Sequence, residues 1–151
     1  MKNNNFLQNI LAIILLGLLF SSCKKDPPTI STTPSITFVS VNPTSVVQFQ
    51  DSISFVISYT DGDGDIGQND PNVYNLFLTD NRINVTYQYR ISQLAPDNAN
   101  IAITGNLTVV LKNAGITDNS TSQSATYSIY LKDRAGHQSN TITSSAITIH
   151  Q

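Results

Sequence analysis

Polar and apolar side chains alternate through most of residues 52–59, and this alternation is what most limits the folds open to the chain. Because successive side chains of a β-strand point to opposite faces, the run puts Ile53, Phe55 and Ile57 on one face and mostly serines on the other. Residues 85–91 alternate in the same way. After the N-terminal leader, no window shows a convincing stripe of apolar residues at the spacing of three and four that an amphipathic helix needs. The pattern therefore predicts an all-β domain.

Seven segments carry this alternation, and turn-forming clusters of Asn, Asp, Gly or Pro separate them. The expected strands are 36–41, 52–59, 73–79, 85–91, 107–111, 127–131 and 141–149. The last segment changes register near Ser144 and Ser145, which predicts a β-bulge. Strands of this number and spacing predict an immunoglobulin-like (Ig-like) or fibronectin-III-like antiparallel β-sandwich of about seven strands over residues 35–151. An up-and-down barrel is the alternative.

The inward-facing positions of these strands predict the hydrophobic core. They are Ile53, Phe55, Ile57, Tyr87, Tyr89, Leu107, Val109, Ile129 and Leu131. Tyr127, near the start of its strand, is a candidate tyrosine corner, and its hydroxyl is expected to reach back toward the turn around Asp118.

A second pattern, an apolar run that ends in a cysteine, precedes the predicted domain. Lys2 supplies a positive charge, the apolar run 10–20 is eleven residues long, and two serines and Cys23 follow it. A run of that length falls short of the ~20 residues that a transmembrane helix needs, so a secretory signal peptide is favoured over a membrane-spanning anchor. The stretch Phe-Ser-Ser-Cys at 20–23 is similar to the lipobox of bacterial lipoproteins, with Phe where Leu is usual.

Residues 1–22 are therefore predicted to be a lipoprotein signal peptide, and Cys23 is the predicted lipidation site. Cys23 is the only cysteine, and its lipidation would leave no reactive thiol in an oxidising compartment. Residues 23–34 hold three prolines and several hydroxyl side chains, which is typical of a flexible tether. The expected location is the outer membrane, where the lipid anchors the chain on the periplasmic face or at the cell surface. The Lys-Lys-Asp cluster at 24–26 resembles the surface-export signal of Bacteroidota lipoproteins.

The loop after residues 52–59 carries Asp61, Asp63 and Asp65 at alternate positions. The whole chain contains ten aspartates and no glutamate, and Asp is the acidic residue typical of turns and cation sites. Carboxylates this close repel one another unless a cation lies among them, and Ca²⁺ prefers six to eight oxygen ligands. The loop resembles the first half of an EF-hand loop, but it lacks the acidic twelfth residue and the flanking helices, so it is not an EF-hand. A solvated turn is the alternative interpretation.

A second loop, 132–140, joins the last two expected strands and contains Asp133. In an Ig-like sandwich the loops after the second and the sixth of the expected strands emerge at the same end, so Asp133 is expected close to the three alternate aspartates. The alternative is a plain hairpin turn in which Gly136 takes a positive φ. Arg134 is also a competitor of the metal, because it can pair with a loop carboxylate. The complete set of predicted calcium ligands is Asp61, Asp63, Asp65, Asp70, Asp133 and the carbonyl of Gly67.

The loop Tyr-Thr-Asp-Gly-Asp-Gly-Asp-Ile-Gly and the ending Asp-Arg-Ala-Gly-His-x-Ser-Asn-Thr-Ile together resemble small, mostly uncharacterised lipoproteins of the Bacteroidota. The resemblance covers essentially the whole chain after Cys23, with His137 where Asn is more usual. It implies a lipoprotein with Ig-like C-terminal strands, and it brings no established activity.

Composition argues against several classes of function. A net charge of −2 without a basic stripe gives nucleic-acid binding no electrostatic support. The absence of glutamate and of a Cys and His set for zinc argues against an enzyme. We therefore expect a non-catalytic cell-envelope lipoprotein whose calcium-stabilised Ig-like domain binds or assembles with an envelope protein or a glycan. The alternative is a glycan-binding accessory lipoprotein of a polysaccharide-uptake system, for which Tyr74, Phe77 and Tyr130 are the candidate exposed aromatic residues.

Overall fold

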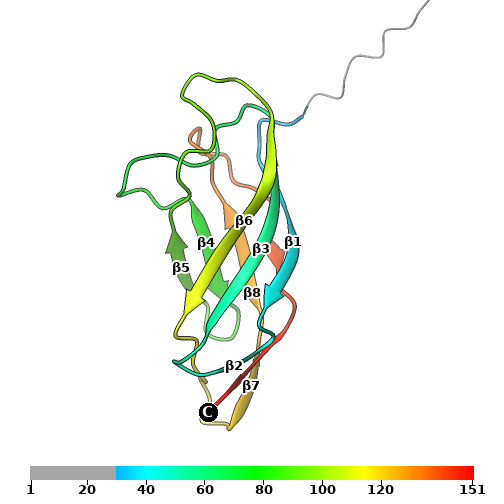
Figure 1. Cartoon of the computed structure of the whole chain (residues 1–151), viewed down its shortest axis with the longest axis vertical. Coiled ribbons are helices and arrows are strands. Elements are labelled where there is room, and N and C mark those ends of the chain that lie inside the picture. The colour runs from blue at the N-terminus through cyan, green and yellow to red at the C-terminus, as the bar shows by residue number, and fades with distance from the viewer. Residues whose placement is uncertain (1–29) are drawn as a thin grey trace, which may run out of the picture.

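A computed structural model describes residues 30–151, which form a β-sandwich (Figure 1). The expected signal peptide 1–22, Cys23 and the first part of the expected tether lie outside the described residues. Across residues 30–151, ten strands form three sheets, and no helix is long and apolar enough to span a bilayer. The prediction of an all-β sandwich is confirmed.

One layer of the sandwich is an antiparallel sheet in which β3 (Ser52–Asp61) lies between β1 (Ser35–Asn42) and β6 (Ile103–Lys112). The strand with the clearest alternation, β3, buries Ile53, Phe55 and Ile57 completely. It pairs with β6 from Ser52↔Lys112 to Asp61↔Ile103. β6 is thus longer than the expected strand 107–111, because residues 103–106 also pair with β3. A glycine and polar residues weaken the alternation in this part of the sequence.

The other layer consists of two sheets that continue one another. In the first, β4 (Leu76–Asp80) lies between β5 (Val85–Tyr89) and β8 (Tyr127–Leu131), and β9 (Ile142–Thr143) pairs with β8. In the second, β10 (Ile147–His150) lies between β7 (Ser122–Ala125) and β2 (Ser45–Val47), and it runs parallel to β2. Only Thr126 separates β7 from β8, and residues 144–146 separate β9 from β10, at the predicted bulge. Across this interruption the Tyr127 N–H donates to Ser144 Oγ (3.0 Å).

The strand order β1-β3-β6 in one layer and β5-β4-β8-β9 in the other is an Ig-like order. It places the end of β3 and the end of β8 at the same end of the sandwich (Figure 1). The loops that follow these two strands meet there, where Ile66 and Asp133 form an isolated β-bridge.

The core between the layers contains most of the residues predicted for it. Those that are buried are Ile53, Phe55, Ile57, Val109, Ile129 and Leu131. Phe55 meets Tyr127 edge to face, with ring centroids 5.2 Å apart. Tyr87, Tyr89 and Leu107 pack against the core but stay partly exposed, because β5 and β6 are edge strands of their sheets.

The predicted tyrosine corner is wrong. The Tyr127 hydroxyl is buried and has no hydrogen-bond partner among the described residues. Asp118 instead accepts hydrogen bonds from the N–H (3.1 Å) and the Oγ (2.6 Å) of Ser120. Burial, together with the charge of Asp80, raises the pKa of Tyr127 to about 12. Asp80 itself forms a buried ion pair with Arg82, with 2.6 Å between Oδ2 and Nη2.

Candidate metal centre

Asp61 occupies an unusual place for a carboxylate, the last inward-facing position of β3. It continues the inward row of Ile53, Phe55 and Ile57, and it is fully buried. Charged side chains are almost never fully buried unless they are paired or hydrogen-bonded. The groups around Asp61 therefore decide what this end of the sandwich can bind.

The loop after β3 folds back on Asp61 through its own backbone. The Asp65 N–H donates to Asp61 Oδ2 (2.9 Å). Gly64 and Gly67 adopt positive φ angles of 77° and 79°, which residues with a Cβ rarely take. A Cβ at Gly64 would also lie 2.5 Å from the carbonyl oxygen of Ile101, so the loop has no room for a larger residue there. The sequence Asp-Gly-Asp-Gly-Asp thus combines charged side chains with the small residues that this tight turn requires.

The loop after β8 lies against this acidic loop, as the Ig-like topology predicts. The N–H of Arg134 donates to the Asp65 carbonyl (3.2 Å), and the N–H of Ala135 donates to Asp65 Oδ2 (3.0 Å). These contacts, with the bridge between Ile66 and Asp133, hold Asp133 beside the end of β3.

Aspartate carboxylates from both loops converge in this arrangement. One side-chain oxygen from each of Asp61, Asp65 and Asp133 lies within 4.8 Å of the other two. The Oδ1 atoms of Asp61, Asp63 and Asp65 are buried and have no hydrogen-bond partner among residues 30–151. A buried polar group left without a partner costs about 1–3 kcal/mol, and more when it is charged. The cluster therefore presents several oxygens whose burial nothing in the described chain compensates.

The pKa values of the cluster reflect the same crowding. Burial raises the pKa of Asp61 above its ordinary value of 3.8, and the charges of Asp63 and Asp65 raise it further. Burial and the charge of Asp133 likewise raise the pKa of Asp65, while the N–H of Ala135 opposes this. The folded chain by itself thus disfavours the ionised carboxylates. A cation among the carboxylates would favour their ionised form and lower their pKa values.

His137 belongs to the site but is not among the predicted residues. Its N–H donates to Asp133 Oδ1 (2.7 Å), and its ring Nδ1 lies 2.9 Å from Asp133 Oδ2. One residue thus fixes the orientation of the Asp133 carboxylate. The spacing Asp-x-x-Gly-His is the sequence signal for this contact. Gly136 has a positive φ of 91°, which turns the chain so that His137 comes back toward Asp133.

Three of the predicted ligands lie outside the group formed by Asp61, Asp65 and Asp133. Asp63 is not part of that group, although its Oδ1 is buried and its charge acts on Asp61 and Asp65. The Gly67 carbonyl accepts a hydrogen bond from Arg134 Nη1 (2.7 Å), so a guanidinium already occupies the surroundings of that oxygen. Asp70 is exposed, and its Oδ1 accepts the Asn72 N–H (2.9 Å), as in an Asx-turn. Arg134 therefore contacts a carbonyl, and it forms no ion pair with a loop carboxylate in the described part of the chain.

The donor set suits a hard cation. An open cavity of about 300 Å³ adjoins the cluster and is lined by Asp63, Asp65, residues 98–100 and Arg134. Water from this cavity could complete the coordination of an ion held by the carboxylates. Oxygen donors of this kind favour Ca²⁺ or Mg²⁺, whereas structural zinc sites use Cys and His.

Comparison of the chain with protein-family models, with curated proteins and with solved structures finds no match in any of the three.

Proposed function

We propose that this protein is a non-catalytic, lipid-anchored protein of the cell envelope whose Ig-like domain is stabilised by calcium and serves in binding or assembly. The observation that carries the calcium part is that Asp61 and Asp65, whose buried Oδ1 atoms have no hydrogen-bond partner among the described residues, converge with Asp133. A single cation would satisfy these oxygens together. The carboxylates of Asp61, Asp65 and Asp133, with water at the remaining positions, supply the six to eight ligands that Ca²⁺ takes.

The compartment expected from the leader also favours calcium. Extracellular calcium modules bind with dissociation constants of about 0.1–1 mM. Magnesium requires a near-ideal octahedron and gives up its water reluctantly, so a cluster of protein carboxylates suits it less well.

A melting experiment on the full chain tests the calcium part. For a Kd of about 0.1 mM, a free calcium concentration of 1 mM adds roughly 1.4 kcal/mol to the stability of the folded state. For a domain of this size that raises the Tm by about 5 °C, and EDTA should reverse the shift. Magnesium at the same concentration is the control and is expected to raise the Tm less. Identical melting in EDTA and in calcium would contradict the proposal.

The envelope part rests on the sequence around Cys23. Because Cys23 is the only cysteine, Cys23→Ser removes the lipid acceptor. Incorporation of labelled palmitate should then be lost, and the protein should leave the membrane fraction or stay uncleaved. An acylated and processed Cys23→Ser protein in the membrane fraction would contradict lipidation at this site.

The non-catalytic part is supported by how the two histidines are used. His137 contacts Asp133, and His150 Nε2 lies 2.8 Å from Ser45 Oγ. A Ser–His pair of the hydrolase type also needs a carboxylate that orients the histidine. No hydrogen bond joins His150 to a carboxylate in the described residues.

A second candidate, glycan binding, depends on one aromatic pair. Phe77 and Tyr130 are paired residues on the outer face of β4 and β8, and their rings stack with centroids 4.7 Å apart. The stacking covers one face of each ring, and Lys132 Nζ lies 5.8 Å from the centre of the Phe77 ring. The pair therefore offers little free aromatic surface to a sugar. Affinity electrophoresis in gels containing soluble polysaccharides, with Tyr130→Ala as the comparison, tests this candidate.

A further inference from the structure

The sandwich is open on the side where β5 and β6 form the edges of its two layers. Among the described strands, β6 pairs only with β3, and β5 pairs only with β4. A seven-stranded Ig-like domain places a further strand, called D, beside the equivalent of β6. Residues 90–102 connect β5 to β6 without forming a strand, so no strand of the described chain occupies the position beside β6 (Figure 1).

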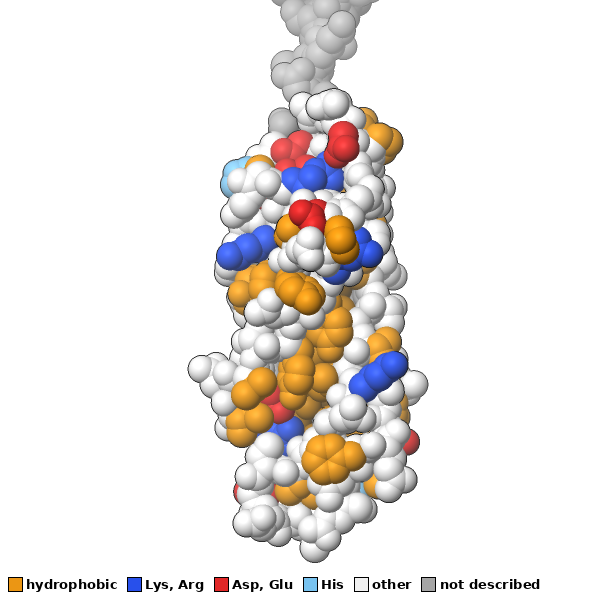
Figure 2. Space-filling model, turned by 90° about the vertical axis from the view of Figure 1, so that its left-hand side faces the viewer, with side chains coloured by type: hydrophobic (Ala, Val, Ile, Leu, Met, Phe, Trp, Pro, Cys, Tyr) orange, Lys and Arg blue, Asp and Glu red, His pale blue; other side chains and the backbone are white. Residues whose placement is uncertain are grey.

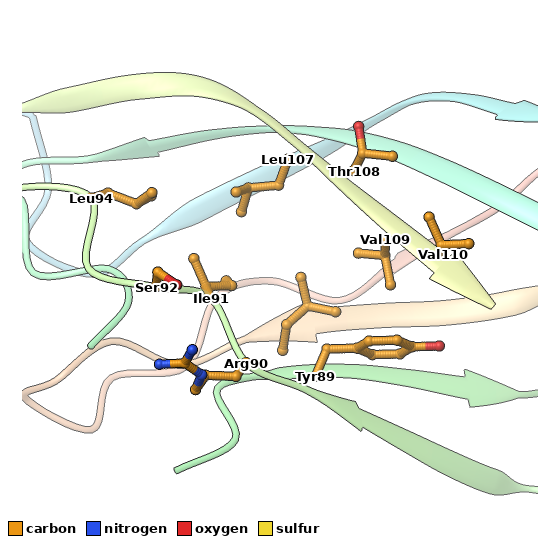
Figure 3. Close-up of a pocket in the computed structure, with 10 residues that line it drawn as sticks. Tyr89, Arg90, Ile91, Ser92, Leu94, Leu107, Thr108, Val109 and Val110 are labelled. Carbon is orange, nitrogen blue, oxygen red and sulfur yellow. The ribbon is translucent and has the colours of Figure 1, made fainter. Parts of the chain in front are cut away.

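An apolar groove of about 380 Å³ lies between the two edges. Its apolar lining consists mainly of Leu76, Tyr89, Ile91, Leu94, Leu107 and Val109. Leu107 and Val109 point from β6 toward the Ile91 side of the groove, and Thr108 points away from it (Figure 3). Figure 2 shows this side of the molecule, where apolar side chains form a column between polar margins. The groove thus exposes side chains that a fourth strand of the β6 layer would cover.

Asn75 fixes one wall of this groove. Its Nδ2 donates to the Ile91 carbonyl (3.1 Å), and its Oδ1 accepts the Ile91 N–H (2.6 Å). Because Asn75 is buried, this pair of hydrogen bonds holds Ile91 in place beyond the end of β5. The groove is therefore formed before anything binds in it.

The free edge of β6 supplies backbone hydrogen-bonding groups along the same groove. Every second residue of an antiparallel edge strand directs its N–H and C=O away from its neighbour. Apart from the pairing with β3, no residue of β6 takes part in a backbone–backbone hydrogen bond with another described residue. An unpaired edge beside an apolar groove matches an extended peptide, which uses its backbone for affinity and alternate side chains for specificity.

The charges beside the free edge of β6 favour some kinds of partner strand over others. Of the described residues that line the groove, Arg90 alone is charged, and Lys112 is the last residue of β6. A second copy of the chain paired edge to edge would bring a second set of these cations to the same edge, which is unfavourable. The chain's own segment 24–29 carries two lysines against one aspartate, and its two prolines have no N–H to donate, so it suits this edge less well. A strand that carries carboxylates is complementary.

We propose that this groove binds an extended, acidic segment of another protein, which adds to the free edge of β6 as a fourth strand of the β1-β3-β6 sheet. Apolar side chains at every second position of the segment enter the groove, and a carboxylate of the segment pairs with Arg90. The inference rests on the binding role proposed above and names the kind of partner, but it does not depend on the calcium site.

The test uses a fluorescein-labelled peptide, Asp-Thr-Val-Thr-Val-Thr-Val-Thr-Asp, titrated with the full chain in lipid nanodiscs and 1 mM calcium. One control peptide has Lys in place of both Asp residues, and a second has the same composition without the alternation. Fluorescence anisotropy is expected to show binding about tenfold tighter for the acidic alternating peptide than for either control. Alternate amides of β6 should exchange hydrogen about tenfold more slowly when this peptide is bound, because only strand pairing protects them.

Arg90→Glu is expected to reverse the preference between the acidic and the basic peptide. Lys132→Glu, which makes the same charge change on the outer face after β8, should leave the preference unchanged. An unchanged Tm would show that Arg90→Glu still folds. Dodecanoate is the second probe, because a groove with one cation could also hold an anionic amphiphile. Binding of dodecanoate but not of the peptide would overturn the proposal. Binding of the peptide without slower hydrogen exchange in β6 would overturn it as well. Melting in calcium is measured separately, so a failure here is distinguishable from a failure of the calcium site.

Discussion

Replacing Asp61 with Asn is expected to stabilise the chain in EDTA and to lose this advantage in calcium. The side-chain oxygens of Asp61, Asp65 and Asp133 approach within 4.8 Å of one another. At an effective dielectric constant of ~20, two unit charges at that separation repel by about 3.5 kcal/mol. The folded chain relieves part of this repulsion by taking up protons, because the pKa values of Asp61 and Asp65 are raised. The amide removes one charge, keeps an acceptor for the Asp65 N–H and adds a donor, so we expect a gain of about 1–3 kcal/mol in EDTA.

Calcium should act mainly on the wild-type chain. For a Kd of about 0.1 mM, a concentration of 10 mM stabilises the wild type by about 2.7 kcal/mol, whereas Asp61→Asn lacks one ligand and gains little. The stability difference between the two proteins should therefore shift by about 2.7 kcal/mol between buffers, as measured by urea denaturation at pH 7.5.

Asp70→Asn is the matched control for this comparison. It removes the same charge from the same loop, but Asp70 lies outside the cluster and contacts the Asn72 N–H. Its stability should change by less than about 0.5 kcal/mol in either buffer. A stability change in Asp61→Asn that is equal in EDTA and in calcium would contradict the calcium site, because calcium would then gain nothing from the Asp61 charge.

Three further predictions concern pH, the core and the buried ion pair. In EDTA, the folded chain holds the protons of Asp61 and Asp65 more tightly than the unfolded chain, because both pKa values are raised. The stability that these protons contribute should be fully present below about pH 4 and should fall as pH rises through the raised pKa values. Urea denaturation between pH 4 and 7 measures this fall, and a rise over the same range would contradict it. Phe55→Ala should cost about 3–5 kcal/mol, since Phe55 is fully buried, and Tyr74→Ala, at a residue 53 % exposed, is the control with little effect. Arg82→Met leaves Asp80 buried without its ion-pair partner and should lower the free energy of unfolding by about 3–5 kcal/mol. The added substitution Asp80→Leu should recover most of that loss. A loss below about 1 kcal/mol for the single variant would show that the pair is not needed.

The sequence predicts strands well where one face of the strand is buried along its whole length. Residues 52–59 and 127–131 lie in central strands, and their alternation directly reflects this burial. The strands β2 and β7 are not predicted, because three or four residues are too few to show a period and both depend on pairing with β10. Val85 fits an inward position by alternation but is 43 % exposed, because β5 is an edge strand at the open side of the sandwich.

The acidic cluster is predictable from topology only in part. The Ig-like strand order is enough to place Asp133 near Asp61, although the two are far apart in the sequence. Sequence does not separate Asp63 from Asp70, since both are aspartates of the same loop. Their difference depends on the loop conformation, which buries Oδ1 of Asp63 and directs Asp70 to the Asn72 N–H.

Calcium binding itself is measured most directly by isothermal titration calorimetry on the full chain after removal of metal with a chelator. We predict one saturable site per chain with a Kd of about 0.1–1 mM for the wild type and for Asp70→Asn, and loss of most of the binding in Asp65→Asn. The absence of saturable binding in the wild type, or an unchanged affinity in Asp65→Asn, would contradict the assignment of this cluster as a calcium site.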